Sequence, residues 1–97
     1  MRYELHAGTI PLSPTFTEYV EGRMKRLLSD FAFIVNSDIF LQELGVKGAT
    51  HQVRLRVHVP GETLVAEERA SNFQEAFDAA LAAVRRQLTR YKETIRS

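Results

Sequence analysis

The sequence contains no cysteine, and its 97 residues include no tract of glycine, serine or proline that would mark a linker. The absence of cysteine excludes disulfide bonds and thiolate zinc sites. No apolar run approaches the roughly 20 residues that span a bilayer, and the N-terminus lacks the charged start and apolar core of a signal peptide. With 44% hydrophobic residues and no internal repeat, residues 1–97 are predicted to form one soluble, cytoplasmic domain.

Sequence patterns of catalytic and metal sites are also absent. The chain has no glycine-rich phosphate loop and no nucleophile elbow. Glu67 and Glu68 are adjacent on a predicted strand, so their carboxylates point to opposite faces and do not act as an acid/base pair. His6, His51 and His58 do not have the spacing of metal ligands. We therefore expect no enzymatic activity, no cofactor, no metal site and no small-molecule substrate.

Apolar periodicity predicts six elements of secondary structure. Ser13 followed by Pro14 is a typical helix start, and apolar residues recur at helical spacing from there to Phe31. In chain order, the predicted elements are a strand at 2–7, a helix at 14–30, a strand at 38–44 whose buried side the pattern does not define, strands at 52–59 and 64–70, and a helix at 71–97 with Ser71 and Gln74 as its capping box.

This order, β-α-β-β-β-α, predicts an α+β fold of two layers. Each helix has one apolar stripe, and the clear strands each have one apolar side. Both helices are therefore expected to cover the same face of a four-stranded sheet. The other face of the sheet then meets solvent or a partner.

The last helix combines the strongest helical pattern with an abrupt change of charge. Residues 73–84 hold two acidic side chains and no basic one, whereas residues 85–97 hold five basic side chains and one acidic one, a balance of +4. Because the net charge of the chain is +1, the remaining residues carry 1 − 4, or −3. An argument for an anionic partner therefore depends on where the charges lie and not on their total.

Arg86 and Arg90 are the first candidates for contacts with RNA phosphates. They lie four residues apart on a helix flank without a carboxylate, and the arginine side chain binds phosphate oxygens in pairs. Basic residues near a helix C-terminus can instead complement the helix dipole, but that effect is confined to about the last turn and does not reach Arg86. Small residues on the same flank would let an RNA backbone approach closely: Ala79, Ala82 and Ala83.

A second set of cations is predicted to support these two arginines. Arg85, Lys92 and Arg96 form a stripe on the opposite flank of the last helix, and Arg23 and Arg26 share one flank of the first helix. Ordinary solvated charge is the alternative interpretation of the stripe on the last helix.

Arg54 is the candidate for an RNA contact on the sheet. A hairpin that pairs Val59 with Leu64 would place Arg56 opposite Glu67 and leave Arg54 without an acidic neighbour. Arg54 is therefore predicted to be available to RNA, and a slip in this register would change the prediction.

Three segments of the chain are typical of one protein family. They are the first-helix residues 18–21 (EYVE) with those that follow up to Phe31, the hairpin VHVPGETLVAE at 57–67, and the last-helix residues from Phe77 to Glu93. In this order they resemble the ribosome hibernation-promoting factor family, which includes the ribosome-associated inhibitor proteins. The resemblance covers essentially the whole chain and is to the short form of the family.

The resemblance implies a double-stranded-RNA-binding-domain-like fold and a role in translation. Members of this bacterial family bind the small ribosomal subunit at the decoding site, in the channel of mRNA and tRNA. They contact ribosomal RNA there and block translation in stationary phase or stress, without catalysis. The chain departs from the family at residues 7–9 (AGT), Ala83 and Thr89, where members often carry a basic side chain, and Arg54 and Arg56 are unusually basic for the third strand.

Two other functions are compatible with the predicted fold. A protein-protein module would form a weak homodimer through the open sheet face, where Val65 and Phe40 are apolar. A small-molecule-regulated enzyme or sensor domain would need a deep polar pocket, and a filled core between the two layers would count against it.

Overall fold

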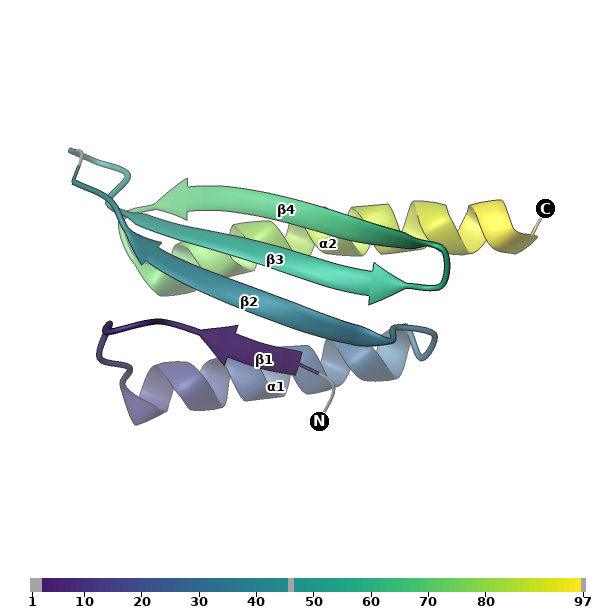
Figure 1. Cartoon of the computed structure of the whole chain (residues 1–97), viewed down its shortest axis with the longest axis horizontal. Coiled ribbons are helices and arrows are strands. Elements are labelled where there is room, and N and C mark those ends of the chain that lie inside the picture. The colour runs from purple at the N-terminus through teal and green to yellow at the C-terminus, as the bar shows by residue number, and fades with distance from the viewer. Residues whose placement is uncertain (1–2, 46, 97) are drawn as a thin grey trace.

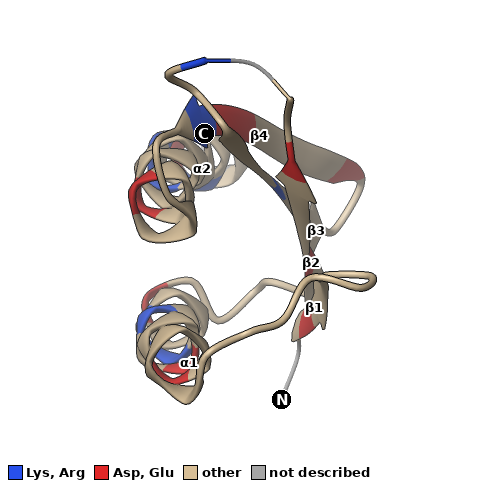
Figure 2. Ribbon diagram, turned by 90° about the vertical axis from the view of Figure 1, so that its left-hand side faces the viewer, with Lys and Arg blue, Asp and Glu red and all other residues tan. Residues whose placement is uncertain are grey.

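The computed structural model describes residues 3–45 and 47–96, with the exception of the Arg96 side chain. The elements follow in the predicted order: β1 (Tyr3–His6), α1 (Pro14–Asp30), β2 (Asn36–Glu43), β3 (His51–Val59), β4 (Glu62–Ala70) and α2 (Phe73–Arg96). The strands form one sheet in the order β1-β2-β3-β4, with β1 parallel to β2 and the other pairs antiparallel. Both helices cover one face of this sheet, α1 behind β1 and α2 behind β3 and β4, which confirms the two-layer prediction (Figure 1, Figure 2).

The two helices begin with different capping residues. Helix α1 starts as predicted, because the Ser13 hydroxyl oxygen accepts a hydrogen bond from the Phe16 amide at 3.1 Å. Helix α2 is capped by Asn72 and not by the predicted Ser71, since the Asn72 side-chain oxygen accepts a hydrogen bond from the Glu75 amide at 2.8 Å. The Ser71 hydroxyl donates instead to the Glu75 carboxylate at 3.1 Å. The prediction was wrong by one residue because both residues are good caps.

Strand β2 begins two residues before its predicted start and ends one residue before its predicted end. The strand begins at Asn36 because this residue already pairs with His58 of β3. Leu44 lies beyond the strand, and its amide donates to the Thr50 carbonyl at 2.7 Å, across the turn that follows.

The buried side of β2, which the sequence pattern did not define, carries Ser37, Ile39 and Leu41. Asp38 and Phe40 alternate with them and lie on the open face of the sheet. A serine on the buried side and a phenylalanine on the outer side obscure the alternation in the sequence. The Ser37 hydroxyl has no hydrogen-bond partner among the described residues.

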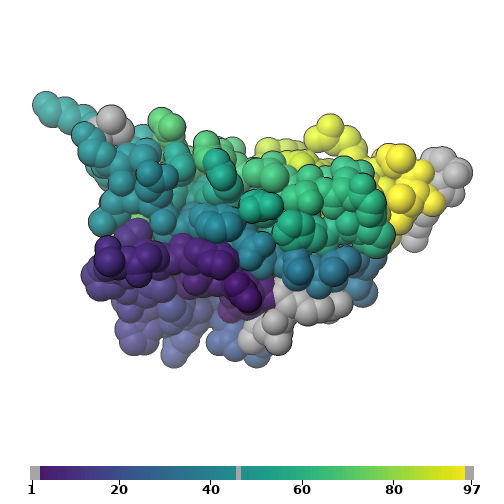
Figure 3. All heavy atoms as spheres, viewed as in Figure 1, coloured from purple at the N-terminus to yellow at the C-terminus, as the bar shows by residue number. Residues whose placement is uncertain are grey.

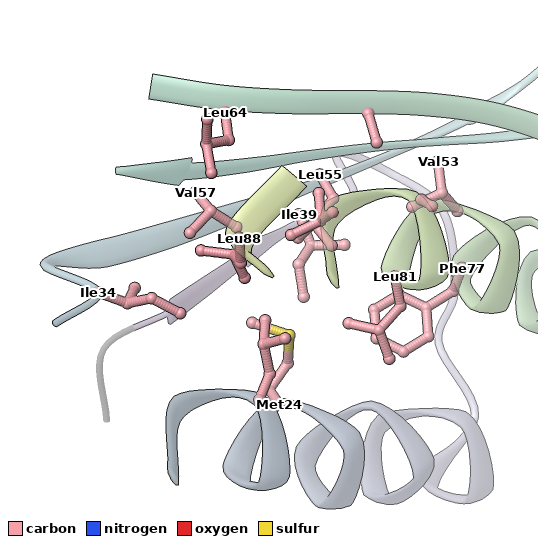
Figure 4. Packing of buried hydrophobic residues seen from close by; sticks show 14 of the residues in the cluster. Met24, Ile34, Ile39, Val53, Leu55, Val57, Leu64, Phe77, Leu81 and Leu88 are labelled. Atoms are coloured by element: carbon pink, nitrogen blue, oxygen red, sulfur yellow. The ribbon is translucent and has the colours of Figure 1, made fainter. Parts of the chain in front are cut away.

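The core lies between the helices and the sheet. Met24 projects from α1 toward Ile39 and Leu88, and Phe77 of α2 lies beside Leu81 below Val53 of the sheet (Figure 4). Burial of each large apolar side chain stabilises the fold by roughly 1.5–3 kcal/mol, so the shared core holds both helices firmly on the sheet. Among the described residues, no helix is long and apolar enough to cross a bilayer.

The hairpin between β3 and β4 has a different register from the predicted one. Val59 pairs with Glu62 and not with Leu64, so Pro60 and Gly61 alone form the turn. Gly61 has a φ of 87°, a value that the third residue of a type II turn requires and that glycine adopts without strain. The shift of two residues leaves each side chain on its predicted face but changes every cross-strand partner.

Candidate nucleic-acid interface

Arg86 and Arg90 lie on an exposed flank of α2. Both side chains are exposed, and neither forms an ion pair within residues 3–45 and 47–96. Ala79 and Ala82 are exposed on the same flank, as the helical spacing predicts. The two guanidinium groups are therefore available to an external anion without the loss of an internal ion pair.

The part of α2 that carries Arg90 is tied to the β3–β4 hairpin. The Tyr91 hydroxyl donates a hydrogen bond to the Pro60 carbonyl at 2.5 Å, and the Gln87 side-chain amide donates to the Val65 carbonyl at 2.9 Å. Arg90 borders a hollow of about 440 Å³ beside these contacts. The two bonds hold this turn of the helix against the edge of the sheet and so fix the backbone position of Arg90.

Asp30, the last residue of α1, joins this helix to α2 through Arg85 and also pairs with Arg26 of its own helix. Its Oδ2 atom lies 2.9 Å from Nη2 of Arg85 and 3.3 Å from Nε of Arg26. The hydrogen bond from Arg85 is the main reason why the pKa of Asp30 lies below its usual value. The Arg85 guanidinium also lies over the Phe31 ring, 5.7 Å from its centroid. The three charged groups together carry a net positive charge, so the contact remains basic.

A second contact between the helices lies at Tyr19. The Tyr19 hydroxyl donates to Oδ1 of Asp78 at 2.6 Å, and this bond is the largest reason why the pKa of Tyr19 is raised. The guanidinium of Arg23 lies over the Tyr19 ring, 5.0 Å from its centroid. Arg23 is exposed and has no ion pair in the described part of the chain. Three predicted residues therefore lie beside the two contacts that join the helices: Arg23 at Tyr19, and Arg26 and Arg85 at Asp30.

The remaining predicted residues are Lys92, Arg96 and Arg54, and they differ in exposure and in ion pairing. Lys92 is half-buried on the flank of α2 that Arg85 shares, without an ion pair among the described residues. The side chain of Arg96 lies outside the described part of the structure. Arg54 was predicted to lack an acidic neighbour, and this was wrong: in the true register it lies opposite Glu67, with Nη2 3.1 Å from Oε1. It also lies on the open sheet face, opposite to the helices.

Sequence reasoning missed the acidic residues that hold the helical surface together. One signal for Asp30 was present, because it follows Arg26 by four residues and such pairs meet on a helix. The pairing of Asp78 with Tyr19 joins residues 59 positions apart and has no local signal.

The family described as Sigma 54 modulation protein / S30EA ribosomal protein matches residues 3–96 of the chain. The chain belongs to the S30EA ribosomal protein family. This membership confirms the resemblance read from the sequence. The proteins of the S30EA family are ribosome-binding factors and not enzymes. No curated protein matches the chain.

Two solved structures show the same fold as this S30EA family member. A ribosomal subunit interface protein from Coxiella burnetii superposes with a TM-score of 0.82 at 22% identity, over 96% of this chain and 99% of that one. The N-terminal domain of Protein Y from Thermus thermophilus superposes with a TM-score of 0.72 at 20% identity, over 90% of this chain and 93% of that one. At such identities the similarity is one of fold alone.

Proposed function

We propose that this S30EA family member binds the small ribosomal subunit at the decoding site, in the channel of mRNA and tRNA, and silences translation there as a hibernation factor. Membership of the family across residues 3–96 is the observation that carries the proposal. The description of the Coxiella burnetii relative as a ribosomal subunit interface protein supports a position between the subunits. In this proposal the chain acts as a single domain in the cytoplasm and keeps ribosomes inactive during stress or stationary phase.

Ribosomal RNA is the proposed ligand of the helical surface. Arg86 and Arg90 are the first proposed phosphate contacts because they are exposed and form no ion pair with a described carboxylate. Phosphate contacts therefore break no internal ion pair. Arg23 follows for the same reason. Arg26 and Arg85 share Asp30, so an RNA phosphate would compete with that carboxylate for them. Lys92 extends the surface toward the C-terminus, Arg96 stays a prediction from the sequence, and Arg54 takes no part in the surface.

The proposed mechanism is competition for space. The described part of the protein measures 44 × 25 × 17 Å, and one core holds its helices and sheet together. A rigid body of this size in the channel excludes mRNA and tRNA without any chemical step. Because the affinity depends on arginine-phosphate pairs, binding releases counterions from the RNA. This release is less favourable at higher salt concentration, so added salt weakens binding.

Sedimentation with purified subunits tests the proposal. The protein is incubated with isolated small subunits or isolated large subunits over a series of potassium concentrations and then centrifuged through sucrose. We expect co-sedimentation with small subunits alone, in a ratio near one, with a steep decrease at high salt. Binding only to large subunits, or to neither, would contradict the proposal. Light scattering of the free protein should give the mass of a monomer, and a stable dimer would favour the open sheet face as the functional surface.

A further inference from the structure

Two carboxylates and one imidazole converge on the open face of the sheet, opposite to the helices (Figure 3 shows this face). Glu4 and His6 come from β1 and Asp38 from β2. The Nε2 atom of His6 lies 3.0 Å from Oδ1 of Asp38 and 3.6 Å from Oε2 of Glu4. One donor atom from each residue lies within 4.8 Å of both others.

These separations suit a metal ion at the centre of the cluster. In a tetrahedral zinc site with bonds of about 2.0–2.1 Å, neighbouring donor atoms are roughly 3.3–3.4 Å apart. The two measured separations, 3.0 and 3.6 Å, lie on either side of that value. Small side-chain rotations would therefore bring Glu4, His6 and Asp38 to binding distance.

The charges of the cluster also favour a bound cation. Both carboxylates face a single ring nitrogen, which holds one proton or one lone pair and so satisfies only one of them well. Neither Glu4 nor Asp38 pairs with a lysine or arginine in the part of the chain that the structure describes. Arg56 is the cross-strand neighbour of Asp38, but its guanidinium lies over the Phe40 ring and forms no ion pair with a described carboxylate. When the imidazoles of His6 and His58 are neutral, the two carboxylates therefore have no ion-paired cation, and one divalent ion would neutralise both.

Further residues hold the proposed ligands in place. The second oxygen of Asp38, Oδ2, lies 3.3 Å from Nε2 of His58, whose Nδ1 is 3.0 Å from the Thr63 hydroxyl. The His6 ring stacks on Phe40, with centroids 4.6 Å apart and planes 13° from parallel. Ligating carboxylates and imidazoles in metal sites are typically oriented by such outer contacts.

We propose that Glu4, His6 and Asp38 bind a divalent transition-metal ion, for which zinc is the probe, with His58 positioning Asp38. One nitrogen and two oxygen donors suit zinc and its neighbours in the first transition row. Three protein ligands leave a coordination position for water or an outside donor. His6 and Asp38 are 40% and 24% exposed, so solvent and ion reach the site freely. The site is independent of the ribosome-binding proposal, which concerns the opposite face.

Calorimetric titration with zinc chloride tests the proposal on untagged protein freed of metal by a chelator. We expect one zinc per chain and a melting temperature that rises with zinc. Glu4→Gln, which alters a side chain whose one ion pair within the described residues is with His6, should weaken binding about tenfold or more, and His6→Gln should weaken it further. His58→Gln should weaken zinc binding less than His6→Gln does. Glu43→Gln, at the exposed end of β2, serves as the matched control and should bind zinc like the unaltered chain.

Cobalt provides a second measurement that does not depend on stability. Cobalt bound by the unaltered chain should give the strong visible absorption of a four-coordinate ion, and Glu4→Gln should reduce it while circular dichroism shows an unchanged fold. The proposal is overturned if the unaltered chain binds no zinc at millimolar concentration. It is also overturned if Glu4→Gln and His6→Gln, both folded, bind zinc as tightly as Glu43→Gln does.

Discussion

Replacement of Arg86 and Arg90 by alanine should weaken ribosome binding without weakening the fold. Neither side chain forms an ion pair with a described residue, and both are exposed, so the free energy of unfolding should change by no more than about 0.5 kcal/mol for each substitution. A hydrogen bond to a charged group contributes roughly 1.5–3 kcal/mol, so loss of each phosphate contact should raise the Kd for small subunits by about 10- to 100-fold.

The salt dependence of binding separates lost phosphate contacts from other causes. Each phosphate contact contributes about 0.7–0.9 to the slope of log K against log salt, so the double variant should lose roughly 1.4–1.8 of that slope. The assay is equilibrium binding of fluorescently labelled protein to small subunits over a potassium series, with urea denaturation of each variant in parallel. Arg69→Ala is the matched control because Arg69 is an exposed arginine on the open sheet face, where it donates to Gln52 at 3.0 Å.

The proposal that Arg86 and Arg90 contact phosphates is refuted if the double variant binds with the affinity and slope of the unaltered chain. An equal loss of affinity in Arg69→Ala would also refute it, since the open face would then contribute as much as the helices do. A loss of affinity accompanied by an unchanged slope would mean that these arginines do not contact phosphates.

Three further substitutions test the structure itself. Ser37→Ala removes a buried hydroxyl without a described partner and should stabilise the fold by about 1 kcal/mol, which raises the melting temperature by roughly 4–8 °C. Tyr91→Phe removes the hydrogen bond to the Pro60 carbonyl and should destabilise the fold by about 0.5–1.5 kcal/mol in urea denaturation. Because Arg85 lowers the pKa of Asp30, this carboxylate stabilises the fold above its unfolded pKa of about 3.9 and ceases to do so as the pH falls through its lower folded pKa. Asp30→Asn should therefore reduce the loss of stability at acid pH, measured by urea denaturation over a pH series. An unchanged pH dependence would contradict the Arg85 contact.

The order of elements and the two layers could be predicted because they depend on local periodicity. The alternation of Val53, Leu55 and Val57 and the helical stripe through Phe77 and Leu88 each identify a buried face from neighbouring residues alone, and all five side chains are fully buried. The positions of Arg86 and Arg90 on an exposed flank follow from the same helical geometry. These features required no knowledge of which elements pack together.

Other features depend on contacts between distant segments and had no local signal. The hairpin register was predicted wrongly because the Pro60-Gly61 turn takes only two residues, and the partner of Arg54 changed with it. The approach of His6 to Asp38 requires the parallel pairing of β1 with β2, which the linear spacing of histidines does not indicate. The Asp30 bridge likewise arises only once the helices lie side by side.

Competition between the protein and tRNA for the small subunit is the sharpest test of whether the protein occupies the decoding site. Small subunits programmed with a short mRNA are loaded with labelled tRNA, and the protein is added at increasing concentration while bound tRNA is measured on filters. We expect that tRNA is displaced, that the protein concentration needed rises with the tRNA concentration, and that the Arg86→Ala/Arg90→Ala variant displaces tRNA only at much higher concentration. Stable complexes that contain tRNA and the protein on the same small subunit would show that the protein does not compete for the decoding site.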